Sequence, residues 1–158
     1  MIRLIWLVVI LIILATQDSK SAQSATWEKV LSCKGNTCKV NAWEGGTIGD
    51  FVEAYLYIKR THKRLVIDRP CYSACVVLAD LARSSVCIKS GARFYQHSAL
   101  FLDKTSQGNM KRVRTARITF APPHSSDIAA HFRTKGKYSL RRFKKMDESF
   151  ARTIWRSC

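Results

Sequence analysis

The stretch RLVIDRPCYSACVVLADLA, residues 64–82, decides the fold of this chain. It opens with Arg64–Asp68, whose apolar centre predicts a strand, and Pro70 then breaks the strand. From Ala74 onward apolar residues recur on one helical face, so a helix follows at once. Ser73 therefore stands at a strand-to-helix turn.

The same alternation continues on both sides of this stretch. Upstream, we predict a strand over Lys39–Trp43, a glycine turn and an amphipathic helix from Ile48. Downstream, strands are predicted over Ser85–Ile88 and Ala92–Gln96. Alternating strands and helices indicate crossover units on a mainly parallel sheet, which places the chain in the α/β class.

The pattern of the carboxy-terminal part predicts two helices. One helix is predicted from Ser125 or Ser126 to Arg133, and another after Ser139, where Leu140, Phe143, Phe150 and Ile154 recur at roughly helical intervals.

The amino-terminal segment has the features of a secretory signal. Arg3 precedes an uninterrupted apolar run from Leu4 to Ala15, and a polar stretch with small residues follows. Because a membrane-spanning helix needs about 20 apolar residues, a signal peptide over 1–25 is predicted, and an uncleaved membrane anchor is the alternative. Cleavage between Ala22 and Ala25 would leave one domain over residues 26–158, in the periplasm or secreted.

Six cysteines follow the predicted signal, and an even number favours disulfides in an oxidising compartment: Cys33, Cys38, Cys71, Cys75, Cys87 and Cys158. A bridge between Cys33 and Cys38 would close a small hairpin. A bridge from Cys71 or Cys75 to Cys87 would lock the turn at Ser73. Zinc binding is the alternative, but the spacings lack a paired-knuckle pattern, so neither a metal nor a cofactor is predicted.

Positive charge is concentrated in the carboxy-terminal third. The formal net charge is +16, and residues 104–158 hold 14 basic and 3 acidic side chains. The runs Lys111–Arg117 and Arg141–Lys145 would suit an anionic surface or a polyanion, and a solvated cationic face is the alternative. No motif that reads nucleic acid is present, so no specific nucleic acid is predicted as a partner.

Three features stand in an order that suits acyl transfer: Gly45–Gly46 at one turn, Ser73 at the next, and His97 at a strand end. A serine hydroxyl becomes a nucleophile when a histidine takes its proton, and backbone N–H groups beside glycines can stabilise the oxyanion. Residues that leave the carboxyl ends of neighbouring parallel strands meet in one crevice. Each motif also has a structural interpretation, since serine caps helices and paired glycines form tight turns.

The segments Glu44–Asp50, Cys71–Cys75 and Ala92–His97 together resemble the proteolytic subunit of Clp protease, in the ClpP/crotonase superfamily. The chain looks most similar to secreted bacterial ClpP-like proteins with a Cys-x-Ser-Ala-Cys motif. The resemblance covers residues 38–98, and its specific part is the spacing of 28 residues from Gly45 to Ser73 and 24 from Ser73 to His97. It implies a ClpP/crotonase-like domain that is shortened at the amino end.

The resemblance also implies the roles of the site residues. Ser73 would be the nucleophile and His97 the general base, and the turn at Gly45 and Gly46 and the N–H of Ala74 would form the oxyanion site. The third member of the triad would be Asp147, with Asp127 and Glu148 as alternatives.

The implied function is an exported, peptidase-like serine hydrolase that uses a Ser-His dyad or a Ser-His-Asp triad. Whether its substrate is a peptide or another acyl compound is left open. A homo-oligomer is a further implication of the resemblance. The alternative is a non-catalytic ClpP-like module whose basic surface holds an anionic partner. A crotonase-type thioester enzyme is disfavoured, because an exported location offers little coenzyme A.

Overall fold

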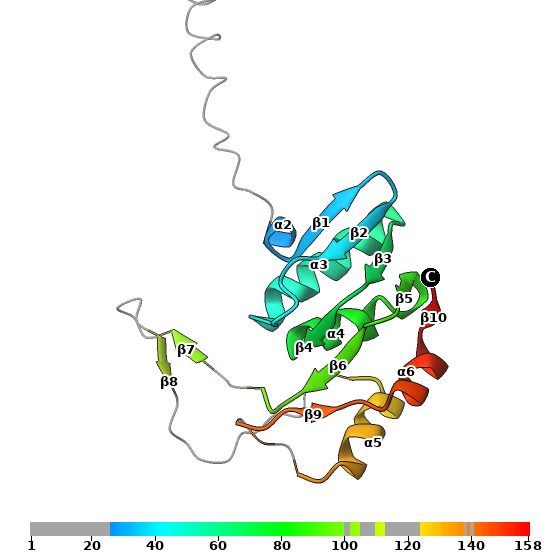
Figure 1. The fold of residues 1–158 in the computed structure, drawn as a ribbon. Coiled ribbons are helices and arrows are strands. Elements are labelled where there is room, and N and C mark those ends of the chain that lie inside the picture. Colours follow the sequence, from blue (N-terminus) through cyan, green and yellow to red (C-terminus); the bar gives the residue numbers. More distant parts are fainter. Residues whose placement is uncertain (1–25, 100–101, 105–109, 113–123, 138, 140) are drawn as a thin grey trace, which may run out of the picture.

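The computed structural model describes residues 26–99, 102–104, 110–112, 124–137, 139 and 141–158. The predicted signal peptide, residues 1–25, lies outside the described residues. The described part is a mixed α/β structure with a mainly parallel sheet (Figure 1). Among the described residues, no helix combines the length and apolar character needed to cross a membrane.

The principal sheet has five strands in the order β1-β2-β3-β5-β10. Only the β1–β2 pair is antiparallel, and the other three pairings are parallel. The strands are β1 (Leu31–Lys34), β2 (Thr37–Val40), β3 (Arg64–Ile67), β5 (Val86–Ile88) and β10 (Arg156–Ser157).

A second sheet carries the candidate site, in the order β4-β6-β9. Strand β4 (Pro70–Tyr72) is parallel to β6 (Arg93–Gln96), which is antiparallel to β9 (Lys144–Lys145). Two further strands, β7 (Leu102–Lys104) and β8 (Met110–Arg112), form a separate antiparallel pair.

The helices are α2 (Thr26–Val30), α3 (Ile48–Thr61), α4 (Ala74–Leu81), α5 (Ser126–Thr134) and α6 (Glu148–Ile154), with a 3-10 turn, η1 (Arg83–Ser85). Helix α4 is the centre of the core, because every residue from Ala74 to Asp80 is buried. Its apolar composition on all sides is what a fully buried helix requires.

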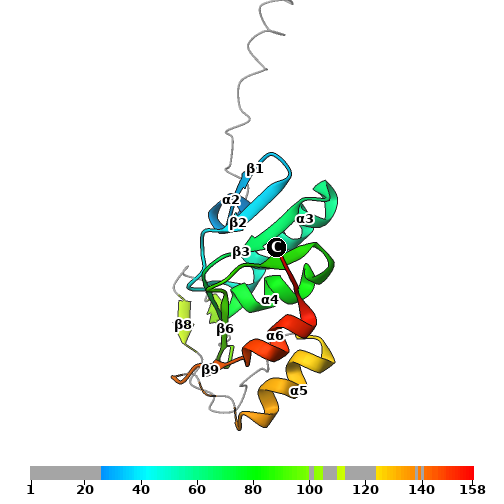
Figure 2. The same cartoon turned by 45° about the vertical axis from the view of Figure 1, so that its right-hand side comes forward.

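The carboxy-terminal elements pack back onto α4 and the principal sheet. Helices α4, α6 and α5 lie next to one another in Figure 2. Trp155, which follows α6, is buried against Phe94 and donates its indole N–H to Ala79 O at 3.0 Å. At the start of α5, Ser125 N donates to the Asp80 carboxylate on α4 at 2.7 Å.

Three disulfides join all six cysteines: Cys33–Cys38, Cys71–Cys75 and Cys87–Cys158. The predicted Cys33–Cys38 bridge is confirmed, whereas the prediction that Cys71 or Cys75 pairs with Cys87 is wrong. The zinc alternative is also wrong for these cysteines, since none is a free thiol. Disulfides in this number are typical of an oxidising compartment.

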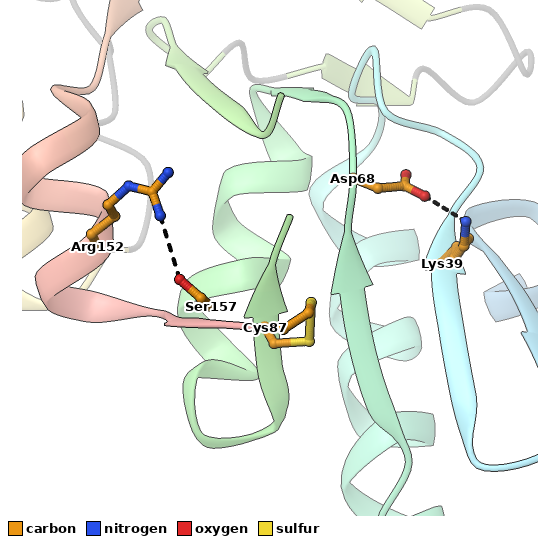
Figure 3. The surroundings of a disulfide bond; sticks show 6 residues. Lys39, Asp68, Cys87, Arg152 and Ser157 are labelled. Atoms are coloured by element: carbon orange, nitrogen blue, oxygen red, sulfur yellow. Dashed lines mark hydrogen bonds and ion pairs between the residues drawn. A yellow bond between two sulfur atoms is a disulfide. The ribbon is translucent and has the colours of Figure 1, made fainter. Parts of the chain in front are cut away.

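The Cys87–Cys158 disulfide fastens β10 to the principal sheet, beside the parallel β5–β10 pairing (Figure 3). Close to it, Arg152 is directed toward Ser157, and Lys39 pairs with Asp68 on the far side of β3 (Figure 3). Because this disulfide closes a segment of 71 residues, chain entropy alone would give it about 4 kcal/mol of stabilisation.

Three predictions of secondary structure need correction. Pro70, expected to be a break, instead begins strand β4. The helix expected after Ser139 begins only at Glu148, because Lys144 and Lys145 pair with Gln96 and Tyr95 as strand β9. The strand expected over Lys39–Trp43 instead ends at Val40.

Candidate active site

Ser73 occupies a strained turn between β4 and α4. Its backbone angles are φ 54° and ψ −117°, outside the regions that a residue with a side chain normally adopts. Strain of this kind costs about 1–3 kcal/mol and is concentrated at functional sites. A serine held in a strained strand-to-helix turn, with its hydroxyl presented at the end of a sheet, is the arrangement of a nucleophile elbow.

The surroundings of Ser73 hold this conformation from several sides. The Cys71–Cys75 disulfide brackets it, and both cysteines are fully buried. Ser73 N donates to Tyr95 O at 2.8 Å, which ties the turn to β6. The preceding residue is also fixed, because Tyr72 N donates to Trp43 O at 2.8 Å.

His97 follows directly after β6, at the same end of the sheet as Ser73. Tyr72 and Tyr95 are register partners in the parallel β4–β6 pair, so the two strands deliver Ser73 and His97 at adjacent carboxyl ends. The half-buried imidazole lies edge-on to Phe143, with ring centroids 4.7 Å apart. Its Nδ1 atom is buried without a hydrogen-bond partner in the described part of the chain.

The glycine turn lies directly against the Ser73 turn. Gly45 has a φ of +95°, and a Cβ at this position would lie 2.8 Å from Tyr72 O and 3.0 Å from Ser73 Cβ. The same position is 3.5 Å from the backbone nitrogen of Ala74. Because Ala74 is the first residue of α4, its N–H has no acceptor within the helix. The arrangement therefore suits the predicted oxyanion role, and Gly46 is the next residue of this turn.

Gly45→Ala is expected to destabilise the protein by about 2–4 kcal/mol, since the methyl group adds a clash to an unfavourable φ. It should also displace Ser73 and lower any reactivity of its hydroxyl. Gly35→Ala is the matched control, because Gly35 also has a positive φ but nothing within 4 Å of an added Cβ. Denaturant unfolding of both variants measures the difference. Equal losses of stability would contradict a close contact at Gly45.

Asp147, the predicted third member of the triad, is given other partners by the structure. Its carboxylate lies 2.5 Å from Lys135 Nζ and 3.7 Å from His131 Nε2. Strand β9 runs antiparallel to β6, and Met146 N donates to Phe94 O. Asp147, the next residue, therefore lies beside the first residue of β6, whereas His97 follows its last residue. The first residue of β6 is about 13 Å along the strand from His97. We therefore limit the candidate catalytic pair to Ser73 and His97.

The two alternative carboxylates are also engaged elsewhere. Asp127 accepts hydrogen bonds from Arg83 and Ser125, and the Arg83 guanidinium holds the pKa of Asp127 well below its usual range. Glu148 pairs with Arg152 along α6 at 2.7 Å. Within the described part of the chain, neither carboxylate has a hydrogen bond or ion pair with His97.

The basic side chains of the predicted clusters differ in their exposure to solvent. Arg141, Arg142 and Lys145 are exposed, whereas Lys144 donates to the carbonyl oxygens of Phe132 and Gly136 and so holds the segment after α5. The run Lys111–Arg117 begins in β8, and its residues 113–117 lie outside the described residues.

Sequence patterns did not single out the aromatic rings around Ser73 and His97. Tyr72 and Tyr95 stack with centroids 4.6 Å apart, and Tyr72 also contacts Trp43 and Phe143. Their positions in the sequence could have indicated them, because Tyr72 directly precedes Ser73 and Tyr95 lies two residues before His97.

Comparison of the chain with protein-family models, with curated proteins and with solved structures gives no match. Within the part that the structure describes, no group of three or more His, Cys, Asp or Glu side chains could hold a metal ion.

Proposed function

We propose that this chain is an exported serine hydrolase, peptidase-like and related to the ClpP/crotonase superfamily, that acts through Ser73 and His97. The single observation that carries the proposal is the strained conformation of Ser73 between β4 and α4. Its register beside β6, which ends directly before His97, supports the pairing of hydroxyl and imidazole. The three disulfides support export, because they suit an oxidising compartment.

In the proposed mechanism, His97 takes the proton of the Ser73 hydroxyl as the oxygen attacks the carbonyl carbon of the substrate. The N–H groups of Ala74 and Gly46 stabilise the negative charge on the carbonyl oxygen, whereas the Gly45 N–H donates to Ala42 O at 3.1 Å. Protonated His97 then gives its proton to the leaving group, and water releases the acyl group from Ser73 by the same steps in reverse.

A fluorophosphonate probe tests the proposal directly. The refolded, disulfide-intact protein is expected to form a covalent adduct, which peptide mass spectrometry should locate on Ser73. Protein unfolded in denaturant is the control and should take no label, because reactivity depends on the folded turn. Absence of an adduct, or an adduct on another serine, would contradict the proposal and favour the alternative of a non-catalytic binding module.

A further inference from the structure

The outward face of the β4–β6–β9 sheet carries a continuous group of rings, which we call the aromatic face: Trp43, Tyr72, Tyr95, His97 and Phe143. Tyr72 is its centre, since it stacks on Tyr95 at 4.6 Å and meets Phe143 edge-on at 5.3 Å. Phe143 connects the group to His97 at 4.7 Å. The core side of the same sheet is distinct, because Phe94, Gln96 and Ser98 alternate with these residues and are buried.

The aromatic face is not closed off from solvent. Phe143 is 49% exposed, which is unusual for a ring of this size, and the other four side chains are only half-buried. Because Tyr72 directly precedes Ser73, a group that packs on the exposed edge of Phe143 and Tyr72 lies beside the proposed nucleophile. Rings arranged edge-on and stacked in this way favour a further ring as their partner.

The charges that flank the aromatic face are mostly positive. Exposed cations in its segments are Arg93, Arg141, Arg142 and Lys145, of which Arg93 and Lys145 also interact with the carboxylate of Glu148. In segments 43–46, 70–73, 93–97 and 141–145 the one carboxylate is Glu44. An occupant that places an aromatic ring on Phe143 would therefore gain from negative charge in the residues next to that ring.

We propose that the aromatic face is the recognition surface of the Ser73 site, and that it selects acidic peptides with an aromatic side chain near the bond that is cleaved. This inference rests on the proposed hydrolase function for the cleavage step. Recognition itself depends only on the rings and the cations, so it can be measured without catalysis.

Binding is measured by NMR titration of the full mature Ser73→Ala protein, which cannot turn the peptides over. Acetyl-Asp-Asp-Phe-amide is expected to bind about 10-fold more tightly than acetyl-Asp-Asp-Ala-amide, and also more tightly than acetyl-Lys-Lys-Phe-amide. Equal affinity for the three peptides would overturn the proposal.

Substitutions in the aromatic face test whether the peptide preference depends on its residues. Phe143→Ala in the Ser73→Ala background should weaken binding of Asp-Asp-Phe about 3- to 10-fold. Because Phe143 is exposed, this variant is expected to keep the fold. Arg141→Ala with Arg142→Ala should reduce the preference for acidic over basic peptides. Leu56→Ala and Arg60→Ala, on exposed positions of α3, are the matched controls and should bind unchanged. Loss of binding in the controls alone would overturn the assignment.

The two proposals fail separately. If the parent protein takes a fluorophosphonate label at Ser73 but Ser73→Ala shows no preference among the peptides, the aromatic face is not the recognition surface. If Ser73→Ala prefers Asp-Asp-Phe but the parent takes no label, the recognition surface stands and the hydrolase proposal falls.

Discussion

Ser73→Ala and His97→Ala are each expected to slow hydrolysis of 4-nitrophenyl acetate by about 10²- to 10⁴-fold, and the double variant by no more than the larger single effect. The physical reason is that, in the proposed mechanism, the imidazole takes the proton of the hydroxyl. When either is removed, the other has no partner with which to act. The measurement is a double-variant cycle on kcat/KM, with circular dichroism to verify folding.

Controls for this cycle come from exposed residues of the same types. Ser126→Ala, at the start of α5, and His62→Asn, at the left-handed end of α3, should retain the parent rate. Asparagine suits the second position because it tolerates a positive φ. If the effects of Ser73→Ala and His97→Ala instead multiply, the two residues act independently and the proposed pair is wrong.

Removal of the Cys71–Cys75 disulfide is expected to lower activity about 10- to 100-fold in a protein that still folds. The bridge spans Ser73, and both of its cysteines are buried, so Cys71→Ala with Cys75→Ala frees the strained turn without opening the surface. A turn that can relax out of a conformation costing about 1–3 kcal/mol spends most of its time in an unreactive state.

The Cys33–Cys38 disulfide offers a closely matched control. It closes a segment of 5 residues, against 4 for Cys71–Cys75, so chain entropy assigns about 2 kcal/mol to each. Cys33→Ala with Cys38→Ala should therefore reduce the free energy of unfolding by a similar amount while leaving hydrolysis unchanged. Equal loss of activity in both double variants would mean that stability, and not the geometry of Ser73, is responsible.

Local patterns were sufficient to predict α3, α4, β3, β5 and β6, since the apolar periodicity of each lies within its own segment. Strand β4 is not predicted from local patterns, because a proline ordinarily indicates the end of a strand. Proline lacks an N–H, but at the first residue of an edge strand no ladder hydrogen bond is lost. The same strand is what brings Ser73 alongside β6.

The remaining errors concern contacts between distant segments. The helix expected around Phe143 is replaced by β9 because pairing with β6 overrides the local helical spacing. The partners of Asp147 likewise follow from that pairing, and sequence distance alone could not give them. The strain at Ser73 could not be predicted either, because the contacts around it, the Cys71–Cys75 disulfide and the Gly45 turn, join residues whose pairing the sequence leaves open.

The connectivity of the disulfides has a consequence for how the polypeptide folds in an oxidising compartment. Two bridges join cysteines only 4 and 5 positions apart, so oxidation can form them while later residues are still emerging. Cys87 must wait for a partner 71 positions later, and β10 cannot be held against β5 before then. If the two short loops close first, Cys87 and Cys158 are the last thiols, and each then has the other as its partner.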